Sequence, residues 1–508
     1  MPDIVTLAAL RALVSFSEPR LSPDAKRVAY VRTTEDRAHD RIAHQILVTR
    51  VAGGGTRTID AGPFVSAPRW SPDGTRLAYL RHTAKHDEDQ IVIVRLDGGT
   101  RRTVTRAPQG VQHFAWSPDS RRLAYVSPDA EPNAAAAKRH DDLFALGNDG
   151  FLTDKPLVPS HLWLVSATGG AARRLTHGTW SVYEGVAPFV GGPCDPSWSP
   201  DGRTILITRA PDAHDAATDR SWPAAVDVAT GAVRDLGTAR QYVYAPAFAP
   251  SGDRYVYLQP HGPGPISAVD AFVAPSSGAA GTDRTATFDR DLQTVRWAGN
   301  TLVATATDGM RQAIVRIPPG GGPQRVDVGA LSVDDVDAAK NGALAFVASS
   351  STRPPELYVM PSANARPRAL TDANAALRRL RFGRVETVRW SAPDGLVSEG
   401  LLVHPVHERA GTKYPLVIWH HGGPEAAINT RLQLRTDQRG RTKSSSFASY
   451  GISRGIGACR GVLSVSRASI LRTASMSDCI HNLRMRVYHG RAIVVQVTAM
   501  ENCSRRSG

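Results

Sequence analysis

The chain has 508 residues, of which 42% are hydrophobic, so it is long enough for more than one domain and apolar enough for globular cores. It has no run of eighteen apolar residues, no basic segment at its start, and only four cysteines, none in C-x-x-C spacing. These features argue against a transmembrane helix, a secretory leader, a disulfide scaffold and a zinc site, so we expect a cytoplasmic protein without a cofactor or metal.

The net charge of +14 is unevenly distributed along the chain. Residues 431–508 hold a local balance of +11, whereas the 430 residues before them amount to +3. Such a charge normally suggests nucleic acid or an anionic membrane as a partner. Because the basic segment has few aromatic side chains to stack on bases, nucleic-acid binding is the least favoured hypothesis, and we expect neither partner.

A four-residue motif recurs along the first half of the chain. Its copies are Ser22-Pro23-Asp24-Ala25, Ser71-Pro72-Asp73-Gly74, Ser117-Pro118-Asp119-Ser120, Ser199-Pro200-Asp201-Gly202 and Ala249-Pro250-Ser251-Gly252. Trp or Phe precedes four of them, and an apolar triplet such as Leu77-Ala78-Tyr79 follows each. Two weaker copies lie at 297–304 and 337–346.

Each copy predicts a β-hairpin, because Pro and Asp-Gly favour a tight turn and the flanking residues favour strands. A second apolar run follows, then Gly-Gly, then a Thr-containing strand, as in 162–176. Four strands in each of seven repeats predict an all-β, seven-bladed β-propeller over residues 1–378. A β-sandwich with coincidental turns is the alternative fold.

Residues 379–430 have a different pattern. Three strands are predicted in succession, at 384–390, 397–404 and 414–420, and the third is an almost continuous apolar run that suits a buried strand. It is followed by His421-Gly422-Gly423. A buried strand followed by His-Gly-Gly is typical of the third strand of an α/β-hydrolase, where backbone N–H groups help bind an oxyanion. We therefore expect the beginning of an α/β-hydrolase domain.

The composition changes abruptly after residue 430. Residues 431–508 contain none of the 35 prolines and none of the nine tryptophans, but three of the four cysteines. One strand is predicted, at 492–497. We interpret this segment as an aberrant basic Ser/Arg-rich tail of doubtful fold, produced by a shift of reading frame, and a genuine basic tail is the alternative. The strand at 414–420 is then expected to lack its sheet neighbours.

These motifs resemble the prolyl oligopeptidase family of serine peptidases, most closely its acylaminoacyl-peptidase and dipeptidyl-aminopeptidase-like branch. The resemblance covers residues 1–430, from the first motif copy to Tyr414-Pro415-Leu416-Val417 and the loop that ends at Pro424. It implies a WD40-like, TolB-like propeller that caps an α/β-hydrolase domain and restricts entry to short peptides. It also implies an acyl-enzyme mechanism with a Ser/Asp/His triad, and it implies that His421, Gly422 and Gly423 lie in the oxyanion loop.

The catalytic residues that this resemblance implies are not found with family spacing, so activity of the chain itself is left uncertain. Gly451-Ile452-Ser453-Arg454-Gly455 matches the nucleophile pattern, but no apolar strand leads into it, and we interpret Ser453 as a chance match. Asp478 and His489, or His481, would have to complete its triad at spacings too short for the family. The alternative function is a non-catalytic propeller that binds proteins. The sequence does not predict the oligomeric state.

Two acidic stretches have the chemistry of metal ligands. They are His86-Asp87-Glu88-Asp89 and His140-Asp141-Asp142. Both lie in or beside polar connections between predicted strands, so we interpret them as solvated charge. The insertion at 131–156 lengthens one blade and is interpreted as a variable surface loop, with a role beside a binding site as the alternative.

Overall fold

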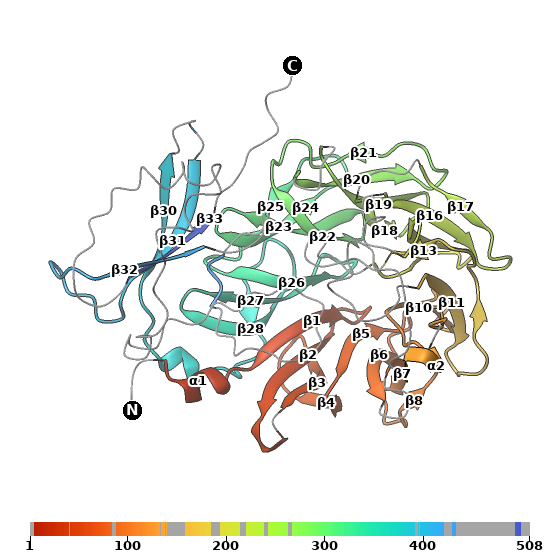
Figure 1. The fold of residues 1–508 in the computed structure, drawn as a ribbon, viewed down its shortest axis with the longest axis horizontal. Coiled ribbons are helices and arrows are strands. Elements are labelled where there is room, and N and C mark those ends of the chain that lie inside the picture. Colours follow the sequence, from red (N-terminus) through yellow and green to blue (C-terminus); the bar gives the residue numbers. More distant parts are fainter. Residues whose placement is uncertain are drawn as a thin grey trace.

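The computed structural model describes residues 5–39, 41–83, 88–132, 134–137, 139, 158–183, 194–213, 220–237, 242–262, 267–391, 395, 397–420, 429–432 and 493–498. Its strands form seven antiparallel sheets and one mixed sheet. Figure 1 shows the seven sheets following one another in chain order around a common centre, as the blades of a propeller. The predicted seven-bladed β-propeller is therefore confirmed. None of the described helices has the length or the apolar run needed to span a bilayer.

We number the blades 1 to 7 in chain order. Blades 1 to 3 consist of β1 (Ser15–Leu21), β2 (Arg27–Asp36), β3 (Arg41–Arg50), β4 (Thr56–Gly62); β5 (Val65–Trp70), β6 (Arg76–Thr83), β7 (Glu88–Arg95), β8 (Arg102–Thr103); and β9 (His113–Trp116), β10 (Arg122–Pro128), β11 (Ser160–Ser166), β12 (Arg173–Arg174). Blade 4 has five strands, β13 (Ser181–Val182), β14 (Ser197–Trp198), β15 (Thr204–Ala210), β16 (Trp222–Asp227) and β17 (Val233–Asp235).

The remaining blades have four strands each. They are β18 (Tyr244–Phe248), β19 (Arg254–Pro260), β20 (Val269–Pro275), β21 (Thr282–Asp283); β22 (Asp291–Ala298), β23 (Thr301–Asp308), β24 (Arg311–Ile317), β25 (Gln324–Arg325); and β26 (Ser332–Ala338), β27 (Leu344–Ser350), β28 (Arg353–Met360), β29 (Arg368–Ala369). The helical segments are short: α1 (Leu7–Arg11), η1 (Arg37–His39), α2 (Ala134–Ala137) and η3 (Leu377–Arg379).

The recurrent motif forms the turn of each hairpin, as predicted. The Ser71 hydroxyl donates to Asp73 at 2.6 Å and accepts from the Arg76 N–H at 3.0 Å, while the Gly74 N–H donates to the Ser71 carbonyl at 2.8 Å. The fourth motif residue has a positive φ in every copy, 56° at Ala25, 69° at Gly74, 60° at Ser120, 70° at Gly202 and 78° at Gly252. This backbone conformation explains why glycine recurs there.

Among the described residues of the propeller, the hydrophobic core forms seven clusters, of which six join two neighbouring blades and one joins blades 4, 5 and 6. In β2, Val28 and Tyr30 pack toward blade 7, whereas Ala29 and Val31 pack toward blade 2. Because successive side chains of a strand point to opposite faces, a strand covered on both faces must be apolar throughout. The continuous apolar triplets of the sequence follow from this double burial.

In blades 2, 3, 4 and 6, a tryptophan before the motif turn joins the blade to the blade before it. The indole N–H groups of Trp70, Trp116, Trp198 and Trp297 donate to the carbonyls of Arg20, Arg69, Ala115 and Ala247 at 2.8, 3.1, 3.4 and 3.0 Å. An arginine of the preceding blade lies over each ring, and these are Arg27, Arg76, Arg122 and Arg254, at 4.8, 5.0, 5.5 and 5.8 Å from the centroid. The repeat therefore encodes contacts between blades as well as turns.

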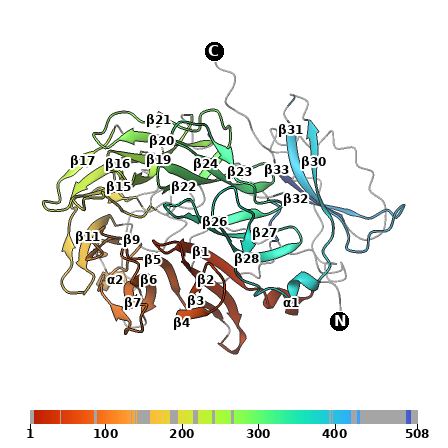
Figure 2. The same cartoon turned by 180° about the vertical axis from the view of Figure 1, so that it is seen from behind.

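Blade 7 closes the ring against blade 1 through side chains that bond backbone groups. The Leu21 N–H donates to Asp337 at 2.8 Å, and the buried Asn374 amide bonds both the N–H and the carbonyl of Val14 at 2.9 Å. The contact of Asp337 has a counterpart between blades 4 and 5, where the Phe248 N–H donates to Ser197 at 2.9 Å. Each of the two blades is built from its own consecutive strands among the described residues. Closure therefore relies on side-chain contacts and packing, and β1 lies beside β26 and β27 in both views (Figures 1 and 2).

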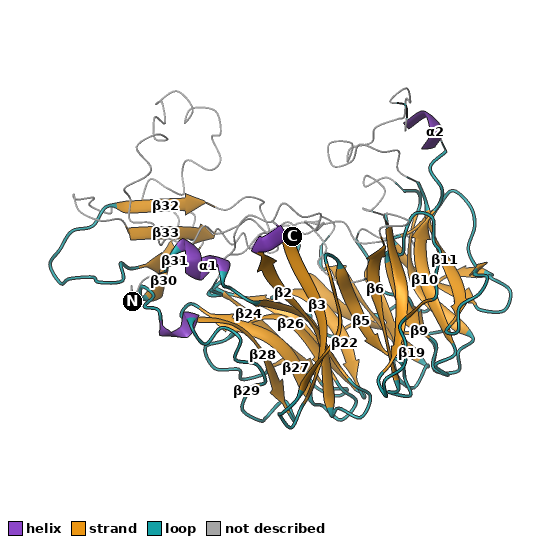
Figure 3. Cartoon of the chain, turned by 90° about the horizontal axis from the view of Figure 1, so that it is seen from below, coloured by secondary structure: helices purple, strands orange, loops and turns teal. Residues whose placement is uncertain are grey.

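The eighth sheet lies beside the propeller (Figure 3) and contains β30 (Val385–Ser391), β31 (Val397–Val403), β32 (Leu416–His420) and β33 (Ile493–Thr498). Its order is β30-β31-β33-β32, with β33 antiparallel to β31 and parallel to β32. All four strands were predicted. The expectation that the strand at 414–420 lacks neighbours is wrong, because β33, from the basic tail, pairs with one of its edges.

Candidate functional site

A cleft of about 830 Å³ lies between blade 6 and the eighth sheet. The hairpin between β23 and β24 supplies Asp308 and Arg311 to one wall, and the β30–β31 hairpin supplies Arg389 and Glu399 to the other. Buried Met310 and Leu401, with Val385, form the apolar contact that holds the two sheets together beside it. The cleft is the place where groups from both parts of the molecule face one another.

Arginine–carboxylate pairs dominate the charge of the cleft. Arg325 and Arg290 donate to Asp308 at 2.6 and 2.7 Å, and these hydrogen bonds outweigh burial and lower the pKa of Asp308 to about 2. Glu399 accepts from Arg389. Asp308 is thus ionised at neutral pH, and both carboxylates are engaged by arginine. Among its described lining residues, the cleft offers the hydroxyls of Thr387 and Thr430 but no histidine, serine or cysteine.

The predicted oxyanion loop starts from the eighth sheet. β32 ends at His420, directly before His421, Gly422 and Gly423, which lie outside the described residues together with Ser453, Asp478, His481 and His489. The chain is described again at Asn429, and the Thr430 N–H donates to the Met310 carbonyl at 2.8 Å, on the wall of the cleft. The two ends of the predicted loop segment are therefore at the end of a sheet strand and at the cleft.

Most of the two acidic stretches also lies outside the described residues. Of the first stretch, Glu88 and Asp89 are described, on β7, and Asp89 lies 3.3 Å from His82. Burial raises the pKa of Asp89, although its side chain is 41% exposed. A single pairing with histidine does not make a metal site.

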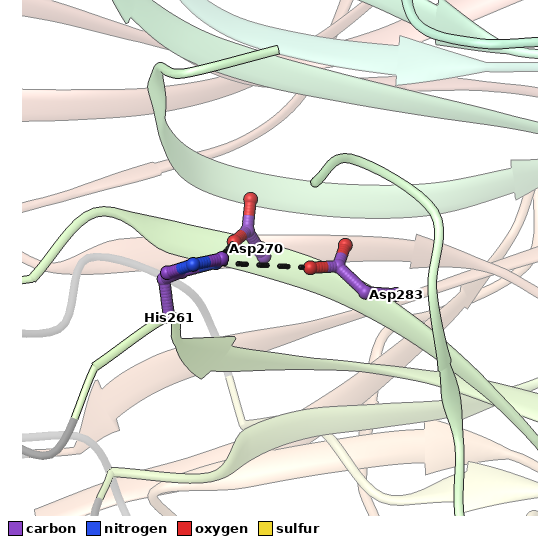
Figure 4. A group of neighbouring side chains, drawn as sticks. All are labelled: His261, Asp270 and Asp283. Atoms are coloured by element: carbon purple, nitrogen blue, oxygen red, sulfur yellow. Dashed lines mark hydrogen bonds and ion pairs between the residues drawn. The ribbon is translucent and has the colours of Figure 1, made fainter. Parts of the chain in front are cut away.

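The structure brings together one cluster that sequence analysis missed, His261, Asp270 and Asp283 (Figure 4). His261 Nδ1 lies 2.9 Å from Asp270 and 3.9 Å from Asp283. The Thr285 hydroxyl donates to Asp270 at 2.8 Å, and burial raises the pKa of the Asp270 carboxyl. Spacing gave no signal for this cluster, because its members come from two strands and a connection.

The propeller repeat explains the position and the hydrogen bond of Asp270 without a bound metal ion. Other blades place a polar residue fifteen positions before a threonine and join the two side chains: Gln90 with Thr105, His161 with Thr176, and Glu356 with Thr371. In each case the threonine also accepts a backbone N–H of the strand, at 2.9 Å. Because Gln, His, Asp and Glu fill the same position, its shared role is to hold the outer strand of the blade. This pairing also explains the recurrent threonine of the sequence.

Comparison with known proteins finds similarity through structure only. No family model matches the chain, and no curated protein matches it in sequence. An acylaminoacyl peptidase of Pyrococcus horikoshii superposes with a TM-score of 0.66 at 18% identity, over 84% of this chain and 64% of that one. A puromycin-hydrolyzing peptidase of Mycobacterium tuberculosis gives 0.62 at 14% identity, over 85% and 65%.

A third structure matches the propeller. The β-propeller domain of the Trilobed protease from Pyrococcus furiosus, described as having an open velcro topology, superposes with a TM-score of 0.52 at 15% identity, over 71% of this chain and 97% of that one. Likeness at these identities shows a shared fold. The chain spans less than two thirds of the length of the two peptidases.

Proposed function

We propose that the protein belongs to the prolyl oligopeptidase family of serine peptidases and that β30, β31 and β32 begin an α/β-hydrolase domain. The observation that carries the proposal is that these three strands lie in a separate sheet directly after a seven-bladed propeller. The third of them, β32, belongs to an almost continuous apolar run of the sequence, as a buried strand of an α/β sheet requires. The position of His421-Gly422-Gly423 directly after β32 supports the same assignment.

The reaction proposed for the intact hydrolase is acyl transfer from short peptides to a serine. The cleft between blade 6 and the eighth sheet supports a site between propeller and hydrolase, where entry is limited by the propeller. We further propose that residues 1–508 by themselves are inactive, because their sequence offers only the isolated pattern at Ser453 as a nucleophile. The domain limits that we propose are 1–378, 379–430 and the tail 431–508.

Two measurements test this proposal. The gene is sequenced from codon 420 to well beyond the stop codon and translated in all three frames. We expect another frame to encode an apolar strand, a Gly-x-Ser-x-Gly elbow and then Asp and His. If no frame does, the family assignment of the second half fails, and the propeller is to be studied as a binding protein.

The activity of the chain is tested separately with a fluorophosphonate serine probe and with acyl- and aminoacyl-peptide substrates. We expect neither labelling nor hydrolysis by residues 1–508. The matched control is Ser453→Ala. Labelling that this substitution abolishes would show that Ser453 is a true nucleophile and would contradict the proposed inactivity.

A further inference from the structure

Seven equivalent residues surround the propeller axis. Each lies on the strand before the motif turn and pairs with the middle residue of the apolar triplet that follows it. We call them the axial ring: Arg20, Arg69, Ala115, Ser197, Ala247, Arg296 and Asp337, paired with Ala29, Ala78, Ala124, Leu206, Val256, Val303 and Ala345. Figure 2 shows β1, β5, β9, β22 and β26 near the centre of the blades.

One contact shows that these strands converge on the axis. Arg69 of blade 2 donates to Asp195, two residues before Ser197 of blade 4, at 2.6 Å, and so reaches past blade 3. Blades that are not neighbours can touch only near the centre of the ring. His113 of blade 3 also lies 3.3 Å from Asp195. The residues of the axial ring therefore face a common space.

The axial ring has two unlike halves. Blades 6, 7, 1 and 2, which are consecutive around the closed ring, contribute Arg296, Asp337, Arg20 and Arg69. The opposite blades contribute only small residues, and these are Ala115, Ser197 and Ala247. Long charged side chains thus lie on one side of the ring, and short side chains lie on the other.

Two of the four charged residues of the axial ring already have hydrogen-bond partners in other blades. Arg69 bonds Asp195 through two nitrogens, at 3.1 and 2.6 Å, and Asp337 accepts the Leu21 N–H at 2.8 Å. Glu18, two residues before Arg20, accepts the Ala67 N–H, and burial raises the pKa of its carboxyl. These acidic groups therefore give little compensation to the other arginines.

Arg20 and Arg296 are the incompletely paired members. Arg20 is 7% exposed, donates to the Pro19 carbonyl at 2.7 Å and lies 3.7 Å from Asp335, yet its buried Nε has no hydrogen-bond acceptor in the part of the chain that the structure describes. The buried Nε of Arg296 also has none, and no hydrogen bond or ion pair joins the Arg296 side chain to any described residue. Burial, followed by the positive charges of Arg296 and Arg69, lowers the pKa of Arg20 to about 10. In each of these two arginines, a buried Nε thus lacks an acceptor among the described residues.

We propose that Arg20 and Arg296 bind the carboxylate of a short peptide at the propeller axis. A carboxylate offers acceptors to both free Nε groups and cancels the repulsion between the two cations, since guanidinium and carboxylate match in geometry. The small half of the axial ring accommodates the rest of the peptide. This inference takes its ligand class from the proposed function, but binding at the axis requires no hydrolysis.

Calorimetric titration of the full chain with acetyl-trialanine tests the proposal. The free acid is expected to bind at least about tenfold more tightly than the same peptide with a C-terminal amide, because a charge-assisted pair is lost with the amide. Equal affinity of acid and amide overturns the proposal without any variant being needed. Sodium acetate is titrated alone to separate a peptide carboxylate from a free anion, and acetate that binds as tightly as the peptide excludes the peptide as the specific ligand.

The variant Arg296→Met locates the site. It is expected to lose the preference for the free acid and to unfold at a higher temperature than the wild type without peptide, because a half-buried arginine whose Nε has no described acceptor is removed. The control Arg106→Met makes the same charge change at an exposed position and is expected to bind like the wild type. An acid preference that survives in Arg296→Met contradicts the site. Since hydrolysis and probe labelling are measured separately, failure of binding leaves the family proposal standing.

Discussion

The interface between blades 2 and 3 differs from the interface between blades 7 and 1 in the side chains that join the two blades. At the first, Trp116 bonds the Arg69 carbonyl and lies beneath Arg76, as the repeat prescribes. At the second, no aromatic residue occupies that place, and Asn374 and Asp337 bond backbone groups more than 300 positions away. Repetition suffices to stack neighbouring blades, but closing the ring requires contacts specific to its two ends.

The strongest test of this comparison removes Trp116. Trp116→Ala deletes a side chain that is 7% exposed, its hydrogen bond and its contact with Arg76, so we expect a loss of about 3–5 kcal/mol of the free energy of unfolding. Denaturant unfolding measures it. Trp116→Phe, which copies Phe248 of blade 5, keeps most of the packing and is expected to cost about 1–2 kcal/mol. Equal effects of the two substitutions would show that packing at this interface contributes little.

The closing interface is tested at Asn374, which is 1% exposed. Asn374→Ala leaves the N–H and the carbonyl of Val14 and the Pro355 carbonyl without this partner, so we expect a loss of about 2–4 kcal/mol. The exposed Asn364 supplies the control, Asn364→Ala, for which no measurable change is expected. A change of less than about 0.5 kcal/mol at Asn374 would show that apolar packing alone closes the ring.

The contact between Arg69 and Asp195 lies across the propeller axis and belongs to neither interface. It is tested through the dependence of the free energy of unfolding on pH. Burial by itself would raise the pKa of Asp195, but the charges of Arg69 and His113 outweigh it and hold this pKa well below the usual range. A lowered pKa in the folded state stabilises the fold above the unfolded value of about 4, and this stabilisation is lost as the pH falls further.

We therefore expect Asp195→Asn to cost about 1–3 kcal/mol at pH 7 and progressively less below pH 4. Thermal unfolding of wild type and variant across this range measures the difference between them. If the difference in stability between wild type and variant does not change with pH, the negative charge of Asp195 does not contribute to stability.

The smallest effects are expected at the fourth residue of the motif. Gly74→Ala places a side chain at a φ of 69°, where the nearest atom, Pro23 Cδ, lies at an ordinary 3.7 Å, so only backbone strain of about 1 kcal/mol is expected. The reverse change, Ala25→Gly, should stabilise by about 0.5 kcal/mol. We infer that all blades require a positive φ at this residue. Changes of the same sign in the free energy of unfolding of the two variants would contradict this requirement.

Local features of the fold could be predicted because they depend on neighbouring residues. The motif at Ser71 specifies its own turn through bonds that span five positions, and the apolar triplets specify strands buried on both faces. The strand at 493–498 was also predicted, although its partners were not. The cleft and the cluster around His261 gave no local signal, since their members come together only when separate strands pack.

The sequence by itself determined the number of blades, the hairpin turns and the existence of the four later strands, since hydrogen bonds and apolar periodicity of this kind act over a few residues. Only the tertiary structure decided that β33 lies between β31 and β32, that blade 1 meets blade 7, and that Arg20 and Arg296 face the same axis. These arrangements join residues about 80 to 360 positions apart, and closure of the ring and strand pairing in the eighth sheet, rather than any short pattern, bring such residues together.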